Sequence, residues 1–345
     1  MLRLSALTLA QLRRFHSIRR AWYSLWILVG LFGLSLFSEH LANDRPLLLG
    51  YEGKIYFPTL RFYSGQTFGD PYRTEADYKK LRDKPAFQEK KGWMLFPPLP
   101  YGPLKPHLDY PGNPPHAPSL THWLGTDGSA RDVVARLLYG FRISMLFALI
   151  IAAIAVVLGA IIGGIQGYCG GWVDIGFQRA IEIWSALPFL YVVILLGAIY
   201  GQGFAMLVAV FSLFEWIGLS FYLRGEFLRL RNQQFVLAAR ALGLSHHRIL
   251  WRHILPNAMT PVITLLPFLI IGAISSLTAL DFLGFGLPVP TPSWGEMLQQ
   301  GLKNLEKPWL AVSSVAALFV TLLLASFIGE GVRAAFDPKA SNRLQ

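Results

Sequence analysis

Glu215 is the clearest candidate for chemistry, because it is an acidic residue in a stretch that is otherwise apolar. It stands between Phe214 and Trp216. If this stretch crosses a bilayer, an ionised carboxylate there costs about 3 kcal/mol or more unless it faces water or a partner group. Two interpretations stay open. Glu215 either lines a watery pathway for a solute, or it is a protonated or hydrogen-bonded carboxyl packed between helices.

The other residues that could hold a metal or act as nucleophiles give weaker signals. His246 and His247 are adjacent, and neighbouring side chains on a helix diverge by about 100°, which makes a poor metal pair. We interpret them as part of a solvated basic loop and predict no metal site. Cys169 is the only cysteine, so it can form neither an intrachain disulfide nor a cysteine-based metal cluster.

Sequence patterns typical of enzymes are missing. The chain has no HExxH zinc pattern, no GxSxG nucleophile elbow and no GxxxxGK[ST] phosphate loop. We therefore expect no catalytic residues, no cofactor of its own and no ATP hydrolysis by this chain alone.

The composition indicates that these residues belong to a membrane protein. Of the 345 residues, 53% are hydrophobic and 15% are charged, whereas an ordinary soluble domain has about 25% charged residues. Uncharged stretches long enough for a helix of about 17 to 25 residues across the bilayer cover residues 21–38, 143–173, 183–214, 253–280 and 308–329.

The stretch 183–214 is too long for one span, and residues 200–203 (YGQG) are typical of a turn. Splitting it there gives helices over 183–200 and 204–223. We therefore predict an all-α polytopic protein with six transmembrane helices, five of them in a core over 143–330. The first helix, 21–38, is expected to be retained, because no small-x-small cleavage site follows it.

The net charge of +11 could suggest a nucleic-acid partner, but its distribution favours a lipid bilayer. Residues 1–20 contain five arginines and no acidic residue, and residues 224–256 contain six arginines against Glu226. Since basic loops stay in the cytoplasm, we predict that both termini, including the tail 331–345, and the loop 224–256 are inside. Residues 39–118 and 281–310 are then outside.

Two regions outside the core have a composition of their own. Residues 39–118 form an extracytoplasmic insert, strand-like over 51–63 and extended in its proline-rich end, 97–118; no fold is predicted for it. Residues 119–142 form an interfacial segment with an amphipathic helix from Thr126 to Phe141, in which Ser129 and Asp132 have capping-box spacing. This helix either covers the end of the bundle or helps to admit a solute.

A stripe of small residues marks the second predicted span. It consists of Gly159, Gly163, Gly167 and Gly171, spaced four residues apart. Small residues let another helix approach closely in lipid, so we assign them to helix packing. The neighbouring helix could belong to this chain or to a partner chain.

The loop 224–256 carries a motif that resembles the EAA loop of ABC-importer permeases. The residues at matching spacing are Leu237, Ala238, Ala239, Gly243, Leu255 and Pro256. The match has one departure, because Leu237 stands where the name of the motif expects glutamate.

Further stretches are similar to dipeptide- and oligopeptide-type permeases of the C-subunit kind. They are residues 122–144, with Ala130 in place of the usual glycine, 167–174, 281–287 and 329–338. The insert, from Asn43 onward, resembles the Yej-type branch associated with microcin C and peptide uptake. The resemblance therefore covers essentially the whole chain.

This resemblance implies a type I ABC-importer transmembrane domain in the bacterial inner membrane. The implied partners are a second homologous permease, two cytoplasmic ATPase subunits, which bind the ATP, and an extracytoplasmic solute-binding protein. In such importers the EAA segment is a coupling helix that docks on the ATPase. The resemblance assigns Leu237, Ala238, Ala239, Gly243 and the Leu255–Pro256 pair to this coupling, with Arg240 as an ionic contact at its edge.

Three other functions remain as alternatives. Nickel import is the runner-up within the family, because related permeases serve both solutes. A gated channel predicts solute flux through this chain alone, whereas an importer subunit needs its partners and ATP. A membrane enzyme would need a catalytic set that the sequence does not show.

Overall fold

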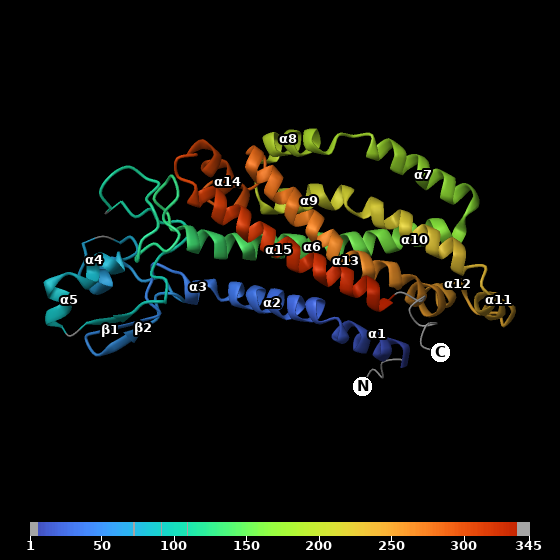
Figure 1. The fold of residues 1–345 in the computed structure, drawn as a ribbon, viewed down its shortest axis with the longest axis horizontal. Coiled ribbons are helices and arrows are strands. Elements are labelled where there is room, and N and C mark those ends of the chain that lie inside the picture. Colours follow the sequence, from blue (N-terminus) through green and yellow to red (C-terminus); the bar gives the residue numbers. More distant parts are fainter. Residues whose placement is uncertain (1–5, 72, 91, 109, 337–345) are drawn as a thin grey trace. The chain divides into compact units, whose positions relative to one another are not determined.

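The computed structural model describes residues 6–71, 73–90, 92–108 and 110–336, most of which are helical (Figure 1). The chain divides into two compact units. Among the described residues, one unit contains 6–29, Ser144–Pro288 and 319–336, and the other contains Gly30–Ile143 and Val289–Leu318.

The helices rich in apolar residues are α2 (Arg19–Leu36), α6 (Val133–Cys169), α7 (Gly171–Ser185), α8 (Phe189–Tyr200), α9 (Phe204–Phe214), α10 (Trp216–Leu230), α13 (Leu255–Leu283) and α15 (Trp309–Phe336). The other helices are α1 (Ala6–Ser17), α3 (Ser38–Leu41), α4 (Tyr78–Arg82), α5 (Pro85–Glu89), α11 (Gln234–Ala241), α12 (His246–Ile249) and α14 (Trp294–Lys303). The turn η1 (Gly65–Phe68) and the π-helical turn η2 (Leu250–Ile254) complete the helical elements.

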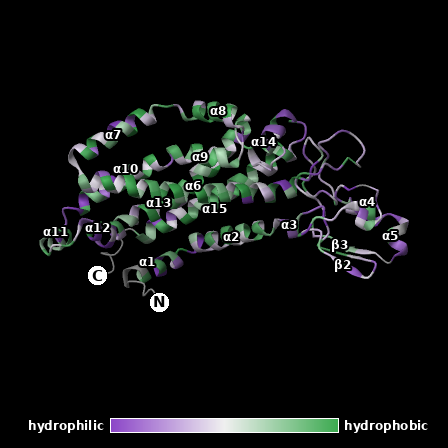
Figure 2. Ribbon diagram, turned by 180° about the vertical axis from the view of Figure 1, so that it is seen from behind, coloured by the Kyte–Doolittle hydropathy of each residue, from purple (hydrophilic) through white to green (hydrophobic). Residues whose placement is uncertain are grey.

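Four helical stretches of the described chain are long and apolar enough to cross a membrane. They are 133–169, 204–230, 246–283 and 309–336, and α7 with α8 adds a fifth if the bent pair counts as one span. Their apolar residues are shown in green in Figure 2. Helix α2 has 18 residues and begins with Arg19 and Arg20, and it is not among these stretches. The protein is thus a mostly helical membrane protein with four or five apolar spans.

The interfacial helix predicted to start at Thr126 is not a separate element. Helix α6 starts at Val133 and continues without a break to Cys169. Residues 126–132 form a turn instead, closed by a bridge between Thr126 and Asp132. The helix starts late because the Oδ1 of Asp132 accepts a hydrogen bond from the Ala135 N–H at 2.8 Å, as an N-cap residue does.

The third predicted span is also interrupted. The stretch 183–200 was expected to be one helix, but α7 ends at Ser185 and α8 begins at Phe189, with a 70° bend between them. Pro188 explains the break, because proline lacks an N–H and disfavours helical backbone at the residue before it. The fourth span has a milder interruption at Glu215, where α9 ends and α10 begins.

The glycine stripe of α6 packs against α10 of the same chain. A Cβ added to Gly163 would lie 2.4 Å from the Ser220 carbonyl oxygen, and one added to Gly167 would lie 2.5 Å from the Arg224 carbonyl oxygen. At Gly159 the nearest atom would be the Leu219 Cβ, at 3.1 Å. Gly171 lies outside this contact: it begins α7, has φ +56° and has no neighbour within 4 Å of a Cβ.

We expect Gly163→Ala to destabilise the packing of α6 on α10 by about 1 to 3 kcal/mol, the usual cost of overpacking. The added methyl group would meet backbone, which cannot rotate away. Gly176→Ala is the matched control, because nothing lies within 4 Å of a Cβ at this helical position. Thermal unfolding of the purified protein should show a lower midpoint for Gly163→Ala only; equal midpoints would contradict the close contact.

The insert contains a small antiparallel sheet with the strand order β2-β1-β3. The strands are β1 (Leu48–Tyr51), β2 (Lys54–Tyr56) and β3 (Trp93–Leu95). Glu52 and Gly53 join β1 to β2 with φ angles of 51° and 75°, the backbone that a two-residue type I′ hairpin requires. The strand-like stretch 51–63 is thus interrupted at two places: Gly53 lies in the hairpin turn, and Pro58 follows the end of β2.

The core of the insert is aromatic. Tyr51, Phe68 and Phe87 are buried with Leu49 and Leu81, and the rings of Tyr51 and Phe87 are stacked with 5.5 Å between their centroids. Such ring pairs contribute about 0.5 to 1.5 kcal/mol beyond the area that they bury. The region 39–118 thus contains a small packed core on which no prediction was made.

Candidate functional site

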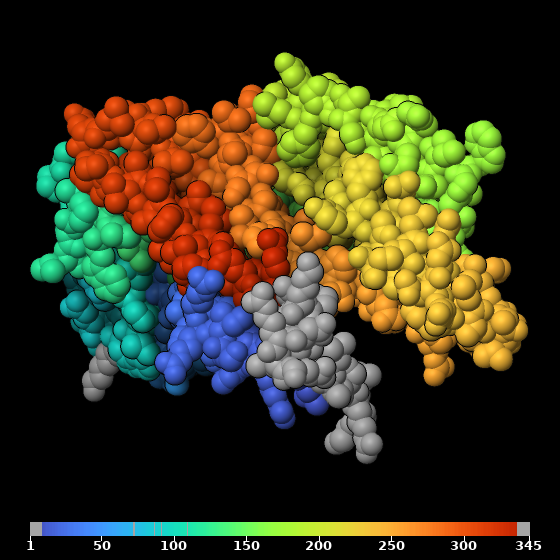
Figure 3. Space-filling model, turned by 45° about the vertical axis from the view of Figure 1, so that its right-hand side comes forward, coloured from blue at the N-terminus to red at the C-terminus, as the bar shows by residue number. Residues whose placement is uncertain are grey.

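The segment between α10 and α13, residues 231–254, contains most of the predicted coupling residues. It consists of α11, α12 and the π-helical turn η2, which leads directly into α13 at Leu255. Figure 3 shows it at the surface in yellow and light orange. We call residues 231–256 the coupling segment. Turns of π-helix are rare and occur frequently at functional sites.

Gly243 ends α11 in a left-handed conformation, with φ +73°. The Gly243 N–H donates to the Arg240 carbonyl at 2.9 Å, and the Leu244 N–H donates to the Ala239 carbonyl at 3.1 Å. These two bonds form a Schellman motif, in which glycine is favoured because a Cβ is strained in this conformation. Gly243 therefore sets the sharp turn from α11 to α12.

Ala239 faces the interior of the coupling segment rather than its surface. The residue is 4% exposed, and its side chain packs in a cluster with Val236 and Ile249. The resemblance assigned Ala239 to coupling, and the structure places it inside the segment, where it holds α11 against Ile249 of α12. Of the other predicted residues, Ala238 and Pro256 are exposed and Leu255 is partly buried.

Two exposed apolar residues, one in α11 and one directly after its last residue, form a surface open to a partner. Leu237 is 49% exposed and Leu242 is 80% exposed. Leu242 was not selected from the sequence, where it reads as one more apolar position of a helix. The structure instead singles out Leu242 by its exposure, because its large apolar side chain extends away from the core at the C-terminal end of α11.

Arginines attach the coupling segment and its flanks to α6 and α7. Arg240 lies over the ring of Tyr168, 5.4 Å from its centroid. Arg231 donates to the Tyr168 carbonyl at 3.3 Å, at the end of α6. Arg224 makes a bidentate ion pair with Asp174, with N–O distances of 2.5 and 2.7 Å. These three arginines therefore make contacts within the chain, and the charge of Arg224 is balanced by Asp174.

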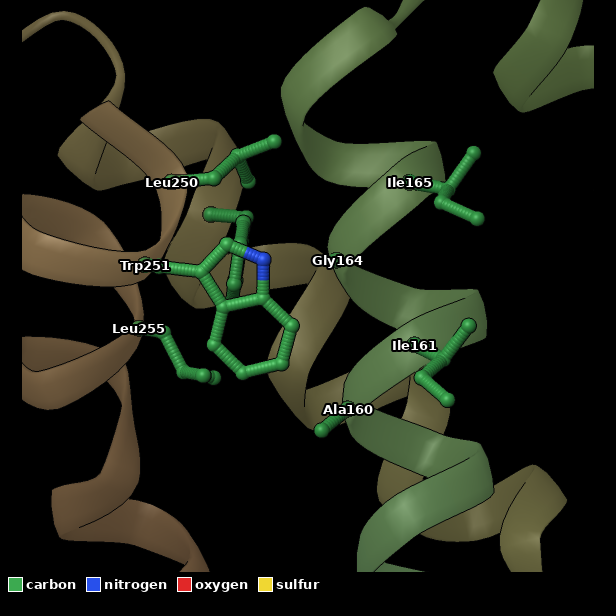
Figure 4. A pocket seen from close by; sticks show the side chains of 8 residues that line it. Ala160, Ile161, Gly164, Ile165, Leu250, Trp251 and Leu255 are labelled. Atoms are coloured by element: carbon green, nitrogen blue, oxygen red, sulfur yellow. The ribbon is translucent and has the colours of Figure 1, made fainter. Parts of the chain in front are cut away.

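A cavity of about 240 Å³ lies beside the coupling segment. It lies between α6 and η2, and Figure 4 shows the indole ring of Trp251 extending toward α6 near Ala160 and Gly164. Trp251 is 59% exposed. Because Ala160 and Gly164 are small, space remains between α6 and the Trp251 ring of η2.

Glu215 lines a second cavity, of about 410 Å³, between α8, the junction of α9 and α10, and α13. Its other lining residues are mostly apolar, and Glu215 itself is partly buried. Within the described residues, its carboxylate makes no hydrogen bond and no ion pair. The Glu215 N–H donates to the Phe211 carbonyl at 2.9 Å, so its backbone N–H has a partner, whereas the carboxylate has none among the described residues.

A buried ion network was missed from the sequence. Arg136, with a fully buried side chain, pairs with Glu296, and its Nε lies 3.3 Å from Asp127 Oδ2. Arg131 pairs with Asp127 at 2.7 Å and with Glu296 at 3.1 Å. Both arginines lie in the stretch 126–141 that was predicted to form an interfacial helix. The four-residue spacing of Asp127 and Arg131 could have indicated one pair, but nothing local indicates Glu296 on α14.

Comparison with known proteins identifies the family. Residues 155–342 match the family described as "Binding-protein-dependent transport system inner membrane component". The chain is 47% identical over 338 residues to the inner membrane ABC transporter permease protein YejE of Escherichia coli strain K12, covering 98% of this chain and 99% of the relative.

Two further relatives extend the similarity. The chain is 42% identical to the peptidoglycan transport system permease protein YejE of Agrobacterium fabrum, covering 96% of this chain and 93% of that protein. It is 39% identical to the oligopeptide transport system permease protein OppC of Haemophilus influenzae over 63% of this chain and 70% of that protein. The similarity to YejE thus includes the insert. This chain belongs to the family of binding-protein-dependent inner membrane transport components and is a multi-pass permease of the inner membrane.

Proposed function

We propose that this chain is the permease subunit of an ATP-driven importer of peptides or peptide-like solutes. The observation that carries the proposal is the identity of 47% along 98% of the chain to an ABC transporter permease. The oligopeptide and peptidoglycan permeases among its relatives support a cargo that contains peptide bonds. Microcin C-type peptides are included in this class through the Yej-type resemblance.

The proposed assembly contains a second, homologous permease, two ATPase subunits and an extracytoplasmic solute-binding protein. ATP is bound and hydrolysed by the ATPases. In this assembly α11 docks on one ATPase through Leu237, Ala238 and Leu242. The proposed membrane topology has six spans, α2 among them, with both termini and the coupling segment in the cytoplasm.

The coupling segment has features suited to transmitting motion. The buried Ala239 and the Schellman turn at Gly243 make α11 and α12 a unit that moves together. The turn η2 connects this unit to α13, and the cavity beside Trp251 gives η2 room to shift. Closure of the ATPases would then move α13, whose Leu265, Phe268 and Leu269 line the Glu215 cavity. We assign this cavity to the solute pathway.

Uptake by the reconstituted complex tests this function. Proteoliposomes that contain both permeases, the ATPases and the binding protein should accumulate labelled trialanine only when ATP is supplied to the ATPase side. Liposomes that lack any one subunit should not. Flux through this chain alone, without ATP, would replace the proposal with a channel.

The topology predicts which sites a membrane-impermeant thiol reagent can reach. In a Cys169→Ser background, a cysteine at Lys79 should be labelled in intact spheroplasts, because the insert lies outside. A cysteine at Ser245 should be labelled only after the cells are opened, because Ser245 lies at the start of α12 in the coupling segment. Labelling of Ser245→Cys in intact spheroplasts would overturn the orientation.

A further inference from the structure

The Glu215 cavity combines one carboxylate with several aromatic rings. Phe189 from α8, Phe214 from α9, Tyr222 from α10 and Phe268 from α13 all line it. Phe189 and Phe214 meet edge to face, with 5.5 Å between their ring centroids. At about 410 Å³, the cavity falls in the range of about 300 to 1,000 Å³ that is typical of small-molecule sites.

No described residue of the chain neutralises the carboxylate in this cavity. A carboxylate in a membrane segment is costly unless it meets a cation, water or a hydrogen-bond donor, and Glu215 has no such partner among the described residues. Arg333 lies over the ring of Phe268, 4.9 Å from its centroid, and it makes no ion pair with Glu215 in the described part of the chain. The cavity therefore has an anionic group available for a cation from outside this chain.

Aromatic rings around the carboxylate favour one class of cation. Ring faces attract ammonium and guanidinium groups within about 6 Å, most strongly where water is excluded. Gly218 lies one turn after Glu215 on α10, and nothing lies within 4 Å of a Cβ built there, so the space in front of the carboxylate is open. A group that carries a positive charge next to an apolar body fits these surroundings.

We infer that the Glu215 cavity binds a primary ammonium group of the solute, such as the N-terminus of a peptide, with Glu215 as its counter-ion. This inference rests on the proposed function, because it takes the cavity to be part of the solute pathway. The aromatic rings surround the carbon atoms next to the ammonium group. A neutral or N-acylated solute would lose the charge interaction and keep only the apolar contacts.

A binding measurement on the whole complex tests this inference without requiring transport. The probe is labelled phenethylammonium, and its uncharged analogue is phenethyl alcohol; both are measured by equilibrium dialysis against the complex in nanodiscs, with empty nanodiscs as the blank. The wild-type complex should bind the ammonium probe about tenfold or more tightly than the alcohol, as expected for one desolvated charge pair. Glu215→Gln should make the two affinities nearly equal, and Glu215→Asp should retain the preference.

Two glycine variants separate this cavity from other binding sites. Gly218→Leu should weaken binding of both probes, because its side chain would fill the cavity from an open position. Gly30→Leu in α2 is the matched control, also with nothing within 4 Å of its Cβ, and it should bind both probes as the wild type does. Unchanged binding in Gly218→Leu would show that the probes bind elsewhere.

Each remaining outcome gives a decision. No preference for the ammonium probe in the wild-type complex would overturn the inference, and it would mean that the partner permease or a packing contact satisfies Glu215. A preference that survives Glu215→Gln would overturn it as well. Uptake of trialanine by the same wild-type complex is measured separately, so a failure of the proposed function is distinguishable from a failure of the ammonium site.

Discussion

Leu242→Asp should reduce ATP-dependent uptake by at least about tenfold while the chain stays in the membrane at its normal level. Leu242 is 80% exposed at the end of α11, so the folded chain loses little when it is replaced. An interface that buries this side chain would lose about 1.5 to 3 kcal/mol of apolar burial and would have to desolvate a carboxylate. Co-purification of the ATPase and uptake should therefore both fall by at least about tenfold.

The matched control places the same charge elsewhere in the coupling segment. Asn232→Asp adds a carboxylate at an exposed position just before α11, and it should leave docking and uptake near the wild-type level. Normal uptake by Leu242→Asp would show that α11 does not dock through this surface. Equal losses in both variants would show that the added charge acts generally, without a specific contact at Leu242.

Two other variants of the coupling segment should fail in a different way. Ala239→Glu would place a carboxylate in the buried cluster of Val236 and Ile249, so it should disrupt the segment itself. Gly243→Asp would place a side chain at φ +73°, a conformation that costs non-glycine residues about 1 kcal/mol or more. Both variants should become more sensitive to proteolysis in this segment, whereas Leu242→Asp should not.

Arg136→Leu should destabilise the protein by about 3 to 5 kcal/mol, the cost of leaving a buried charge without its partner. The side chain of Arg136 is fully buried and pairs with Glu296 and Asp127. It also donates to the carbonyls of Pro103 and Pro290, each at 3.2 Å. Its loss removes contacts from the end of the insert and from the loop before α14 at once. Thermal unfolding and limited proteolysis of residues 97–118 should detect the change.

Arg142→Leu is the matched control on the same helix. Arg142 pairs with Glu39 at 2.8 and 2.9 Å, but both side chains are partly exposed, at 21% and 41%. Pairs of this kind contribute about 0.2 to 1 kcal/mol, so the unfolding midpoint should change little. The double variant Arg136→Leu with Glu296→Leu should recover part of the stability, because it removes the unpaired carboxylate. Equal midpoints for Arg136→Leu and Arg142→Leu would contradict the network.

The sequence by itself determined the membrane class, the approximate position of most spans and the family. This is possible because a chain in lipid has to satisfy its backbone within each helix, so long apolar stretches such as those in α6 and α15 are sufficient evidence for helices. The resemblance to the EAA loop also directed attention to residues 231–256 and to Gly243, which adopts the left-handed conformation that favours glycine. The glycine stripe predicted close helix packing, since the absence of a Cβ is a local property.

Only the tertiary structure decided which faces and which distant residues meet. It bent the third span at Pro188, turned Ala239 inward, left Leu242 exposed and paired Arg136 with Glu296, which lies 160 positions later in the chain. Helical periodicity says that two residues share a face, but the neighbour of that face depends on packing between helices far apart in sequence. The cost of a buried charge likewise depends on its partner, and that partner is supplied by the fold.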